Sequence, residues 1–325
     1  MKVAFLDFAS LHPDDLDTAG LHRQLTEVNL WPDTHPHELL ERLAGAQVAV
    51  INKLRLDAAT LRQLPDLRLV CLAATGTDNV DLAAARELNI AVSNLRDYCT
   101  HSVVQHVFAL ILALNQKLDV YREAVRAGAW QASGQFCLFE SPIRELHGKT
   151  LGVIGLGVLG GGVAGVARAF GMRVIAARLP WRLSQPTGTS GQSAPRVPLT
   201  ELLEEADVIS LHCPLTTETQ NLINAEALQR MQPNALLINT ARGGLVDSAA
   251  LIDALKQDRI GGAGIDVLAQ EPPNNHDVLL TCDLPNLIVT PHIAWSAREA
   301  RQRALDEIVA NIVAFADGKE RNRVC

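Results

Sequence analysis

A glycine-rich turn between two short apolar runs constrains this chain more than any other feature. Residues 151–154 form a run of apolar, strand-forming residues that leads into Gly155, Gly157 and Gly160, which have the spacing G-x-G-x-x-G. Small apolar residues continue at helical spacing to Phe170, and a second apolar run follows. This order of strand, turn, helix and strand is the setting that a dinucleotide-binding fingerprint requires. The pattern therefore predicts a dinucleotide site, with a purely structural turn as the alternative.

Each glycine of the turn has its own predicted role. Gly155 permits the sharp turn, Gly157 lets backbone amides approach a pyrophosphate, and Gly160 lets the helix lie close to the strand. The start of the helix also offers unpaired N–H groups and a partial positive charge to phosphates. We expect this turn to hold the pyrophosphate of a nicotinamide dinucleotide.

The end of the second strand bears on the choice of dinucleotide. A site that prefers NAD places Asp or Glu there to bond the ribose hydroxyls. This chain has Arg178 instead, with Arg182 close behind. A guanidinium pairs well with a 2′-phosphate, so we predict NADP(H) as the preferred cofactor, with NAD(H) also possible. The alternative is that Arg178 is a solvated strand end. Residues 180–198 are then either a clasp over the 2′-phosphate or a plain surface loop.

Size and composition narrow the class of protein. With 325 residues the chain is long enough for two domains, and 48% hydrophobic and 20% charged residues are typical of a globular protein. A net charge of −7 argues against nucleic acid or an anionic membrane as a partner. We find no signal-peptide pattern and no apolar run of transmembrane length. The six cysteines show no metal-ligand spacing. We therefore expect a cytoplasmic protein without a metal site.

Apolar runs and helix-like stretches alternate twice along the chain. The first set of runs covers residues 3–8, 48–51, 67–74 and 90–92, and the second covers 150–154, 172–177, 207–212, 235–240, 262–267 and 287–290. Alternation of this kind predicts α/β architecture with parallel sheets. We expect two doubly wound domains, a Rossmann-type cofactor domain and a flavodoxin-like substrate domain, with a cleft between them.

The domain boundaries follow from the same pattern. We predict a substrate domain from residues 1–98 and 297–325, and a dinucleotide-binding domain from residues 99–296. A long helix is expected over 101–127, and a final helix over 297–316 returns the chain to the first domain. Residues 129–142 are aromatic and irregular. They either pack locally or embrace a second subunit.

Three polar residues follow predicted strands of the second domain: Arg242, Glu271 and His292. Singly, each has a structural interpretation, as a surface arginine, a loop carboxylate or a core histidine. Jointly they supply what reduction of a 2-oxo acid requires. His292 can donate the proton, and Glu271 can fix its tautomer and raise its pKa. Arg242 can hold the substrate carboxylate and polarise the oxo group.

Residues 238–247, 264–273 and 290–295, together with the glycine turn, resemble the D-isomer-specific 2-hydroxyacid dehydrogenases. Within that family, residues 73–81 and 292–295 (His-Ile-Ala-Trp) are most similar to the glycerate dehydrogenases, a group that includes the glyoxylate and hydroxypyruvate reductases. The resemblance implies the catalytic set Arg242, Glu271 and His292, and a homodimer joined through the cofactor domains. It also implies two further sets of residues. Those that contact the cofactor are Gly155, Gly157, Leu159, Gly160, His212, Cys213, Pro214, Thr240, Ala241, Arg242, Asp266, His292 and Ala294. Those that contact the substrate are Lys53, Thr75, Gly76, Arg242, His292 and Trp295.

The resemblance gives particular roles to some of these residues. Asp266 is expected to bond the nicotinamide carboxamide, and the amides of Thr75 and Gly76 to hold the substrate carboxylate. Trp295 either caps the pocket or is a core tryptophan. The chain departs from the family at two places, since Arg178 replaces the usual acidic residue and Gln105 stands where many members have glutamate.

The leading hypothesis is an NADPH-dependent reductase of glyoxylate or hydroxypyruvate. The alternative is a binding protein of the same fold that senses NAD(P)H, as some transcriptional corepressors do, without significant turnover. No disordered tail or basic segment supports that alternative. A relative that oxidises formate would not need a histidine paired with a carboxylate, because no oxygen is protonated in that reaction.

Overall fold

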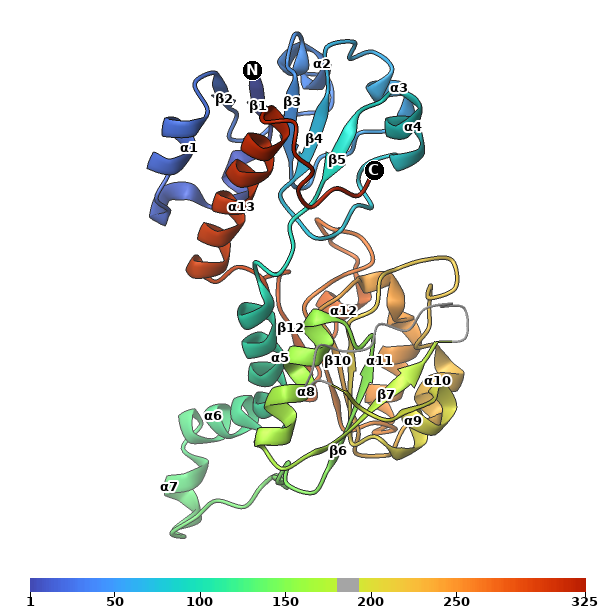
Figure 1. The fold of residues 1–325 in the computed structure, drawn as a ribbon. Helices are drawn as coiled ribbons and strands as arrows, with labels where there is room; N and C mark the ends of the chain where they lie inside the picture. Colours follow the sequence, from blue (N-terminus) through green and yellow to red (C-terminus); the bar gives the residue numbers. More distant parts are fainter. Residues whose placement is uncertain (180–192) are drawn as a thin grey trace. The chain divides into compact units, whose positions relative to one another are not determined.

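The computed structural model describes residues 1–179 and 193–325, which form two compact units. Unit 1 consists of Met1–Cys99 and Trp295–Cys325, and unit 2 of Thr100–Ala294 (Figure 1). The boundaries predicted from the sequence, after residues 98 and 296, lie within two residues of these divisions.

Unit 1 contains a five-stranded parallel sheet with the strand order β2-β1-β3-β4-β5, which is the flavodoxin-like order. Its strands are β1 (Val3–Phe5), β2 (Val28–Leu30), β3 (Val48–Ile51), β4 (Leu69–Leu72) and β5 (Ala91–Ser93). Strand β2 was not expected, because a three-residue segment with a central asparagine gives no recognisable alternation. The other four strands lie within or beside the predicted apolar runs.

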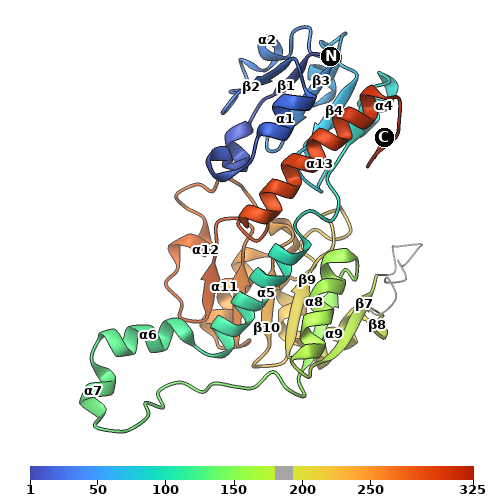
Figure 2. The same cartoon turned by 60° about the vertical axis from the view of Figure 1, so that its left-hand side comes forward.

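Helices cover both faces of this sheet, which explains why strands β1, β3 and β4 are uniformly apolar. The helical segments of unit 1 are η1 (Phe8–Leu11), η2 (Pro13–Asp15), α1 (Ala19–Gln24), α2 (Leu39–Leu43), α3 (Ala58–Leu61), α4 (Leu82–Glu87) and α13 (Arg298–Ala316). Helix α13 runs across the strands beside α1 (Figure 2). The Sγ atom of Cys71 in β4 faces α13, whereas Val70 and Leu72 pack with α2, α3 and α4.

Unit 2 contains a seven-stranded parallel sheet with the order β12-β11-β10-β9-β6-β7-β8, the doubly wound Rossmann arrangement. Its strands are β6 (Thr150–Ile154), β7 (Arg173–Arg178), β8 (Arg196–Pro198), β9 (Val208–Leu211), β10 (Leu236–Asn239), β11 (Gly262–Ile265) and β12 (Leu287–Val289). Strand β8 lies at the end of the segment that was expected to be a loop. The predicted fold class, α/β with two parallel sheets, is confirmed.

Helices also cover both faces of the second sheet. They are α5 (Thr100–Asn115), α6 (Leu118–Arg126), α7 (Ala129–Ser133), α8 (Val158–Ala169), α9 (Leu199–Glu205), α10 (Ala225–Arg230), α11 (Ser248–Lys256) and α12 (Val278–Thr281), with η3 (Gly243–Leu245). Glycines in two of the strands let helices pack closely against the sheet, one helix on each face. A Cβ at Gly264 would lie 3.0 Å from Leu110 of α5, and one at Gly152 would lie 2.7 Å from Leu202 of α9.

The single helix expected over 101–127 is wrong, because the structure has two helices there. Lys117 adopts a left-handed conformation, with φ of 54°, and such a residue ends an α-helix. Helices α5 and α6 consequently meet at a 55° bend. Among the described residues no single helix meets the length and composition expected of a membrane span, and only this bent pair does so jointly.

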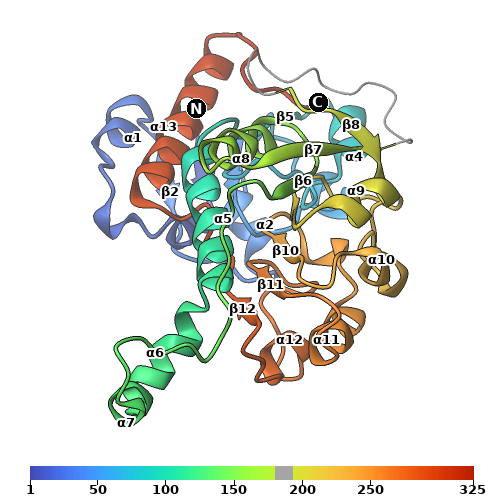
Figure 3. The same ribbon diagram turned by 90° about the horizontal axis from the view of Figure 1, so that it is seen from below.

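Helices α6 and α7 project from the rest of unit 2 as an arm (Figures 2 and 3). The segment after α7 carries two phenylalanines whose rings are almost fully exposed, Phe136 at 93% and Phe139 at 86%. Local packing, one of the two interpretations of residues 129–142, therefore does not bury these rings. The N-terminal part of this segment is also helical rather than irregular.

Candidate functional site

The glycine turn joins β6 to α8, and its shape depends on the missing side chains. Gly155 has φ of 104°, and a Cβ there would lie 2.5 Å from the carbonyl carbon of His212. A Cβ at Gly160 would lie 2.3 Å from the carbonyl oxygen of Gly155, so only glycine lets α8 start this close to β6. Around Gly157, by contrast, no atom would lie within 4 Å of an added Cβ. The backbone is therefore crowded on the protein side and open at Gly157.

The start of α8 provides amide donors beside this open position. The first hydrogen bond of the helix runs from the amide of Gly161 to the carbonyl of Gly157, at 2.8 Å. The amides of Val158, Leu159 and Gly160 therefore precede the first helical donor and have no acceptor within the helix. Unpaired amides at a helix start, next to a glycine that leaves room, fit a dinucleotide pyrophosphate.

The predicted cofactor segment His212-Cys213-Pro214 follows β9 and lies against the glycine turn. The amide of His212 donates to the carbonyl of Ile154 at 2.7 Å, and the ring Nε2 lies 2.8 Å from Ser210 Oγ. Burial lowers the pKa of His212 to about 4. This imidazole is therefore neutral at neutral pH and lacks the second proton of an imidazolium acid.

Arg178 is the last residue of β7, the strand beside β6, and its side chain is exposed. One N–H of its guanidinium, on Nη2, donates to the carbonyl oxygen of Arg196 at 3.2 Å. The side chain is thus at the carboxyl edge of the sheet, where the sequence placed it. Arg182, the second arginine predicted to contact a 2′-phosphate, lies outside the described residues.

The segment after β10 carries Thr240, Ala241 and Arg242. The side chain of Asn239 organises it, since Oδ1 accepts from the Ala241 amide at 3.0 Å and Nδ2 donates to the Arg242 carbonyl at 2.8 Å. Thr240 Oγ1 is buried without a hydrogen-bond partner among the described residues. An orphaned hydroxyl at the carboxyl edge of a Rossmann sheet is a group that a bound cofactor could satisfy.

His292 and Glu271 form a close polar pair at this edge of the sheet. His292 Nδ1 lies 2.5 Å from Glu271 Oε2, and the other carboxylate oxygen of Glu271 accepts from the Leu268 amide at 2.8 Å. The carboxylate is therefore anchored on one side and contacts the imidazole on the other. Nε2 is the ring nitrogen that Glu271 does not engage. Both side chains are about one-third exposed, 28% for His292 and 32% for Glu271.

Sheet order brings the three predicted catalytic residues to neighbouring positions. Strands β10, β11 and β12 are adjacent, and Arg242, Glu271 and His292 follow their carboxyl ends. The segments of Arg242 and Glu271 also touch through the backbone, because a Cβ at Gly243 would lie 2.0 Å from the carbonyl carbon of Leu268. The guanidinium of Arg242 donates to the carbonyl of Ala241 at 2.7 Å.

Asp266 directly follows β11 and lies beneath the segment that carries His292. Its carboxylate accepts from Thr290 Oγ1 at 2.6 Å and from the amides of Ile293 and Ala294, each at 2.9 Å. The His292 amide donates to the Asp266 carbonyl at 2.8 Å. The side chain has no exposed surface. The carboxylate thus accepts from the segment that carries His292, and its bond to a nicotinamide carboxamide stays a prediction.

Sequence reasoning missed two residues of helix α5 that reach this segment. Ser102 Oγ donates to the Ala294 carbonyl at 2.7 Å, and His106 Nε2 lies 3.0 Å from Thr290 Oγ1. A signal for them existed, because residues four apart on a helix share a face. Two polar residues with that spacing on a mostly apolar helix indicate polar partners.

In unit 1, a buried carboxylate holds the segment that carries Lys53. Asp7 accepts from the amide of Asn52 at 2.9 Å and from that of Lys53 at 2.7 Å. Burial raises the pKa of Asp7, against the opposing effect of these amides. The ammonium of Lys53 lies 5.9 Å from the ring centre of Trp295, which in turn contacts Tyr98 edge-on at 6.3 Å.

The other predicted substrate residues of unit 1 lie after β4. Thr75 uses its hydroxyl to bond the Leu95 carbonyl at 2.9 Å, and its carbonyl accepts from Asn94 Nδ2 at 2.8 Å. Neither the Thr75 amide nor the Gly76 amide has an acceptor in the part of the chain that the structure describes. Trp295 is half-buried, in contact with Tyr98 and Lys53.

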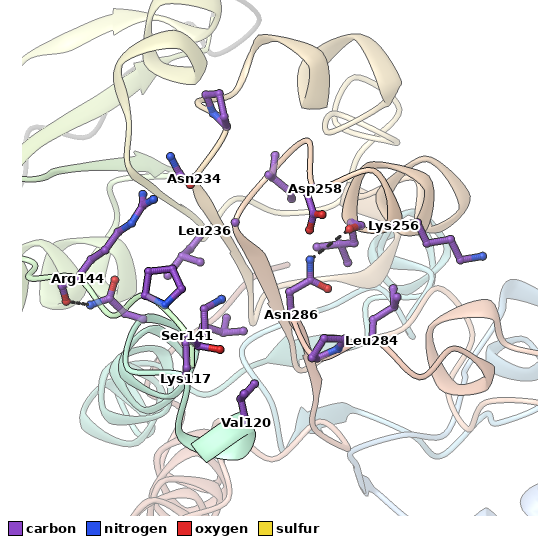
Figure 4. Close-up of a pocket in the computed structure, with 18 residues that line it drawn as sticks. Lys117, Val120, Ser141, Arg144, Asn234, Leu236, Lys256, Asp258, Leu284 and Asn286 are labelled. Carbon is purple, nitrogen blue, oxygen red and sulfur yellow. Dashed lines mark hydrogen bonds between the residues drawn. The ribbon is translucent and has the colours of Figure 1, made fainter. Parts of the chain in front are cut away.

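A cavity of about 580 Å³ lies elsewhere in unit 2 (Figure 4). It is lined by the starts of β10 and β12, the junction of α5 and α6, and residues 141–144. Ligands of open parallel sheets bind beyond the carboxyl ends of the strands, whereas this cavity is at the amino ends. We therefore do not assign it to the cofactor. Within residues 1–179 and 193–325, no group of three His, Cys, Asp or Glu side chains could hold a metal ion.

Comparison with known proteins identifies the family. The family model "D-isomer specific 2-hydroxyacid dehydrogenase, NAD binding domain" matches residues 108–294, which is most of unit 2. This chain belongs to the D-isomer-specific 2-hydroxyacid dehydrogenase family. It is accordingly an oxidoreductase with an NAD-binding domain.

Relatives of the whole chain agree with this family. Glycerate dehydrogenase of Methylorubrum extorquens is 47% identical over 323 residues, covering 99% of this chain and 98% of the relative. Hydroxypyruvate reductase of Blautia hydrogenotrophica is 34% identical and covers 100% of this chain and 99% of its own. Among solved structures, the acyclic imino acid reductase Bsp5 in complex with NADPH and D-Arg is 30% identical, with a TM-score of 0.87 and full coverage of both chains.

Proposed function

We propose that this dehydrogenase reduces a small, unphosphorylated 2-oxo acid, glyoxylate or hydroxypyruvate, with NADPH as the preferred reductant. The observation that carries the proposal is the 2.5 Å contact between His292 and Glu271 at the carboxyl edge of an NAD-binding sheet. Such a pair can deliver a proton to a carbonyl oxygen, which a protein that only senses the cofactor does not need.

The residues of this chain divide the reaction as follows. A bound reduced nicotinamide supplies the hydride that reaches the carbonyl carbon. His292 gives the proton on Nε2 to the carbonyl oxygen, while Glu271 holds Nδ1 and stabilises the charged imidazole. Arg242 binds the substrate carboxylate and polarises the oxo group. His212 is unsuited to the role of acid because burial keeps it neutral.

The choice of substrate rests on the relatives and on the available cations. The two whole-chain relatives named above act, by their names, on glycerate or hydroxypyruvate. Lys53 of unit 1 and Arg242 of unit 2 are the cations that we assign to the substrate, and their roles require a carboxylate and an oxo group but no phosphate. Lys53 and the amides of Thr75 and Gly76 are our candidates for holding the substrate carboxylate. Trp295 limits the size of the substrate side chain.

The choice of NADPH rests on Arg178. Its exposed guanidinium occupies the strand end where a carboxylate would bond the ribose hydroxyls in a site that prefers NAD. A guanidinium attracts the 2′-phosphate and offers no acceptor to a free hydroxyl. NADH is expected to serve as a weaker substitute.

The arm supports a homodimer. Phe136 and Phe139 expose their rings almost completely, and exposed aromatic rings grouped on a projecting segment are typical of a protein contact. We propose that a second copy of the chain covers them, as in the dimer that the family resemblance implies.

The experiment is a turnover assay that follows the absorbance of the reduced cofactor. Glyoxylate, hydroxypyruvate and pyruvate are each tested with NADPH and NADH, on the wild type and on Arg178→Gln. We expect the highest kcat/KM with NADPH and one of the two proposed acids. Arg178→Gln should raise the KM for NADPH about tenfold and leave that for NADH within about twofold, because a charge-assisted contact is worth roughly 1.5–3 kcal/mol. Tight NADPH binding without oxidation by any acid would instead support a sensor.

A further inference from the structure

We propose that His106 of helix α5 is a positioning residue for the proton transfer, acting through the segment 290–294 that carries His292. The inference rests on the proposed function, because it assumes that His292 is the acid. It assigns to His106 no contact with substrate or cofactor. Its role would be to fix, through hydrogen bonds, where the His292 ring lies.

The contacts form a chain from the helix to the segment. His106 Nε2 lies 3.0 Å from Thr290 Oγ1, and Thr290 Oγ1 lies 2.6 Å from Asp266 Oδ1. The ring nitrogen is also 3.5 Å from the same carboxylate oxygen. Asp266 accepts in addition from the amides of Ile293 and Ala294. Both sides of His292 in the sequence are thereby tied to one buried carboxylate.

The direction of each bond follows from counting protons. An ionised carboxylate only accepts, and a threonine hydroxyl has a single proton to give. Because the short contact with Asp266 takes that proton, Thr290 Oγ1 must accept from His106. His106 therefore carries its proton on Nε2, and it is the donor that completes the network. An apolar residue at position 106 would leave the Thr290 oxygen with an unsatisfied lone pair and loosen the Thr290–Asp266 contact.

A second contact from the same helix reinforces the first. Ser102, one turn before His106, donates through Oγ to the Ala294 carbonyl at 2.7 Å. Helix α5 thus holds the segment at Thr290 and at Ala294, on either side of His292. Residues 102 and 106 share a face of the helix, so one rigid element sets both positions.

The segment needs this support because its central residue has an unfavourable backbone conformation. His292 has φ of 56°, in the left-handed region that residues other than glycine rarely adopt. Such conformations persist where the surroundings determine them. The 2.5 Å contact with Glu271 depends on this backbone, since a relaxed His292 would point its ring elsewhere.

The test compares four variants. His106→Leu removes the donor, and His106→Gln keeps an N–H donor at a similar reach. Ser102→Ala removes the second contact. His101→Leu is the matched control, because His101 is an exposed histidine of the same helix whose side chain makes no hydrogen bond among the described residues. Each variant is measured for kcat, for the KM of NADPH, for the pH dependence of kcat/KM and for thermal unfolding.

We expect His106→Leu to lower kcat about ten- to a hundredfold, because small misplacements of a reacting group cost up to about a hundredfold. The KM for NADPH should stay within about twofold of the wild type. The pH at which kcat/KM falls to half should shift, since the His292–Glu271 contact is disturbed. His106→Gln should recover most of kcat, Ser102→Ala should lose less than His106→Leu, and His101→Leu should match the wild type.

Two results would overturn the proposal. One is a wild-type kcat and pH profile in His106→Leu. The other is a loss in His106→Gln as large as that in His106→Leu, since this would show that the ring fills space rather than donates. If His106 only stabilises the fold, His106→Leu will lower the unfolding temperature without shifting the pH profile, and that outcome also contradicts the proposal.

A further measurement separates this inference from the proposed function. The proton on His292 Nδ1, bonded to Glu271, should give a proton NMR signal far downfield in the wild type and in His106→Gln. In His106→Leu the signal should broaden or move upfield. This readout needs no turnover, so it tests the positioning role even if none of the 2-oxo acids is reduced, an outcome that would defeat only the proposed function.

Discussion

Two buried carboxylates, one in each unit, solve the same structural problem in different ways. Asp7 lies after β1 and accepts from amides of the segment that follows the neighbouring strand β3. Asp266 lies after β11 and accepts from amides of the segment that follows the neighbouring strand β12. Each segment carries a predicted site residue, Lys53 in unit 1 and His292 in unit 2. In both sheets, a carboxylate at one strand end holds the loop of the next strand.

The difference lies in what else each carboxylate contacts. The bonds to Asp7 that we describe come from backbone amides, those of Asn52, Lys53 and Leu54. Asp266 adds a hydroxyl, from Thr290, and through it the ring of His106. In unit 1 the buried carboxylate thus contacts backbone amides, and Asn79 supports the same segment through the carbonyls of Asn52 and Leu54. In unit 2 the network of the carboxylate also includes side chains, one of them from helix α5. This matches the demands of the two roles, because proton transfer is more sensitive to position than attraction of an anion.

The largest effect should separate these two roles directly. His292→Ala is expected to lower kcat by about two to four orders of magnitude, the usual contribution of a positioned acid. Lys53→Met should act mainly on the KM of the 2-oxo acid, with kcat changed by less than about fivefold. The reason is that a charge that only binds the substrate stabilises the bound substrate and the transition state equally. Steady-state kinetics of the two variants test this division. An equal loss of kcat in both variants would contradict the division between a binding residue, Lys53, and an acid, His292.

An intermediate effect is expected for Asp266→Asn. The amide keeps one acceptor oxygen but turns an NH₂ group toward donors, so buried N–H and O–H groups lose their partner. We expect the unfolding free energy of unit 2 to fall by about 2–3 kcal/mol, the cost of such unsatisfied groups. Urea unfolding followed by circular dichroism measures it. We also expect Asp266→Asn to lower kcat more strongly than Asp7→Asn does, because Asp266 positions the acid. The reverse order would contradict the contrast drawn between the two carboxylates.

The smallest effect concerns Asp7 and depends on pH. Burial raises the pKa of Asp7 above its ordinary value of 3.8, so between that value and the raised pKa the folded state binds more protons than the unfolded state. Stability from this group is complete below pH 3.8 and declines as the pH rises through the raised pKa. Asp7→Asn lacks this decline. The advantage of the wild type over Asp7→Asn in unfolding free energy should therefore shrink as the pH rises, as urea unfolding at several pH values will test. A gap that widens with pH would mean that the three amides outweigh burial.

The sequence was most informative where one residue type has no substitute. The turn at Gly155 and Gly160 could be predicted because a Cβ at either position would overlap the backbone. Strand β6 was predicted with its observed bounds, since an apolar run with β-branched residues marks it locally. The segments after β10, β11 and β12 were found because each ends an apolar run with a charged or titratable side chain.

The features that escaped prediction depend on partners distant in the sequence. Strands β2 and β8 are three residues long and owe their conformation to the strand beside them. The break at Lys117 has no proline or glycine to announce it. His106 interacts with residues 184 positions away, so its role cannot be deduced from its neighbours in the chain.

Helix α5 has a consequence that reaches beyond its own packing. Its first turns hold the segment of the acid, and its last residue adjoins the Lys117 bend from which the arm departs. No flexible joint lies between these ends, and a helix of sixteen residues is about 24 Å of stiff rod. One helix therefore adjoins the root of the arm at its last residue and bonds the segment of His292 near its first.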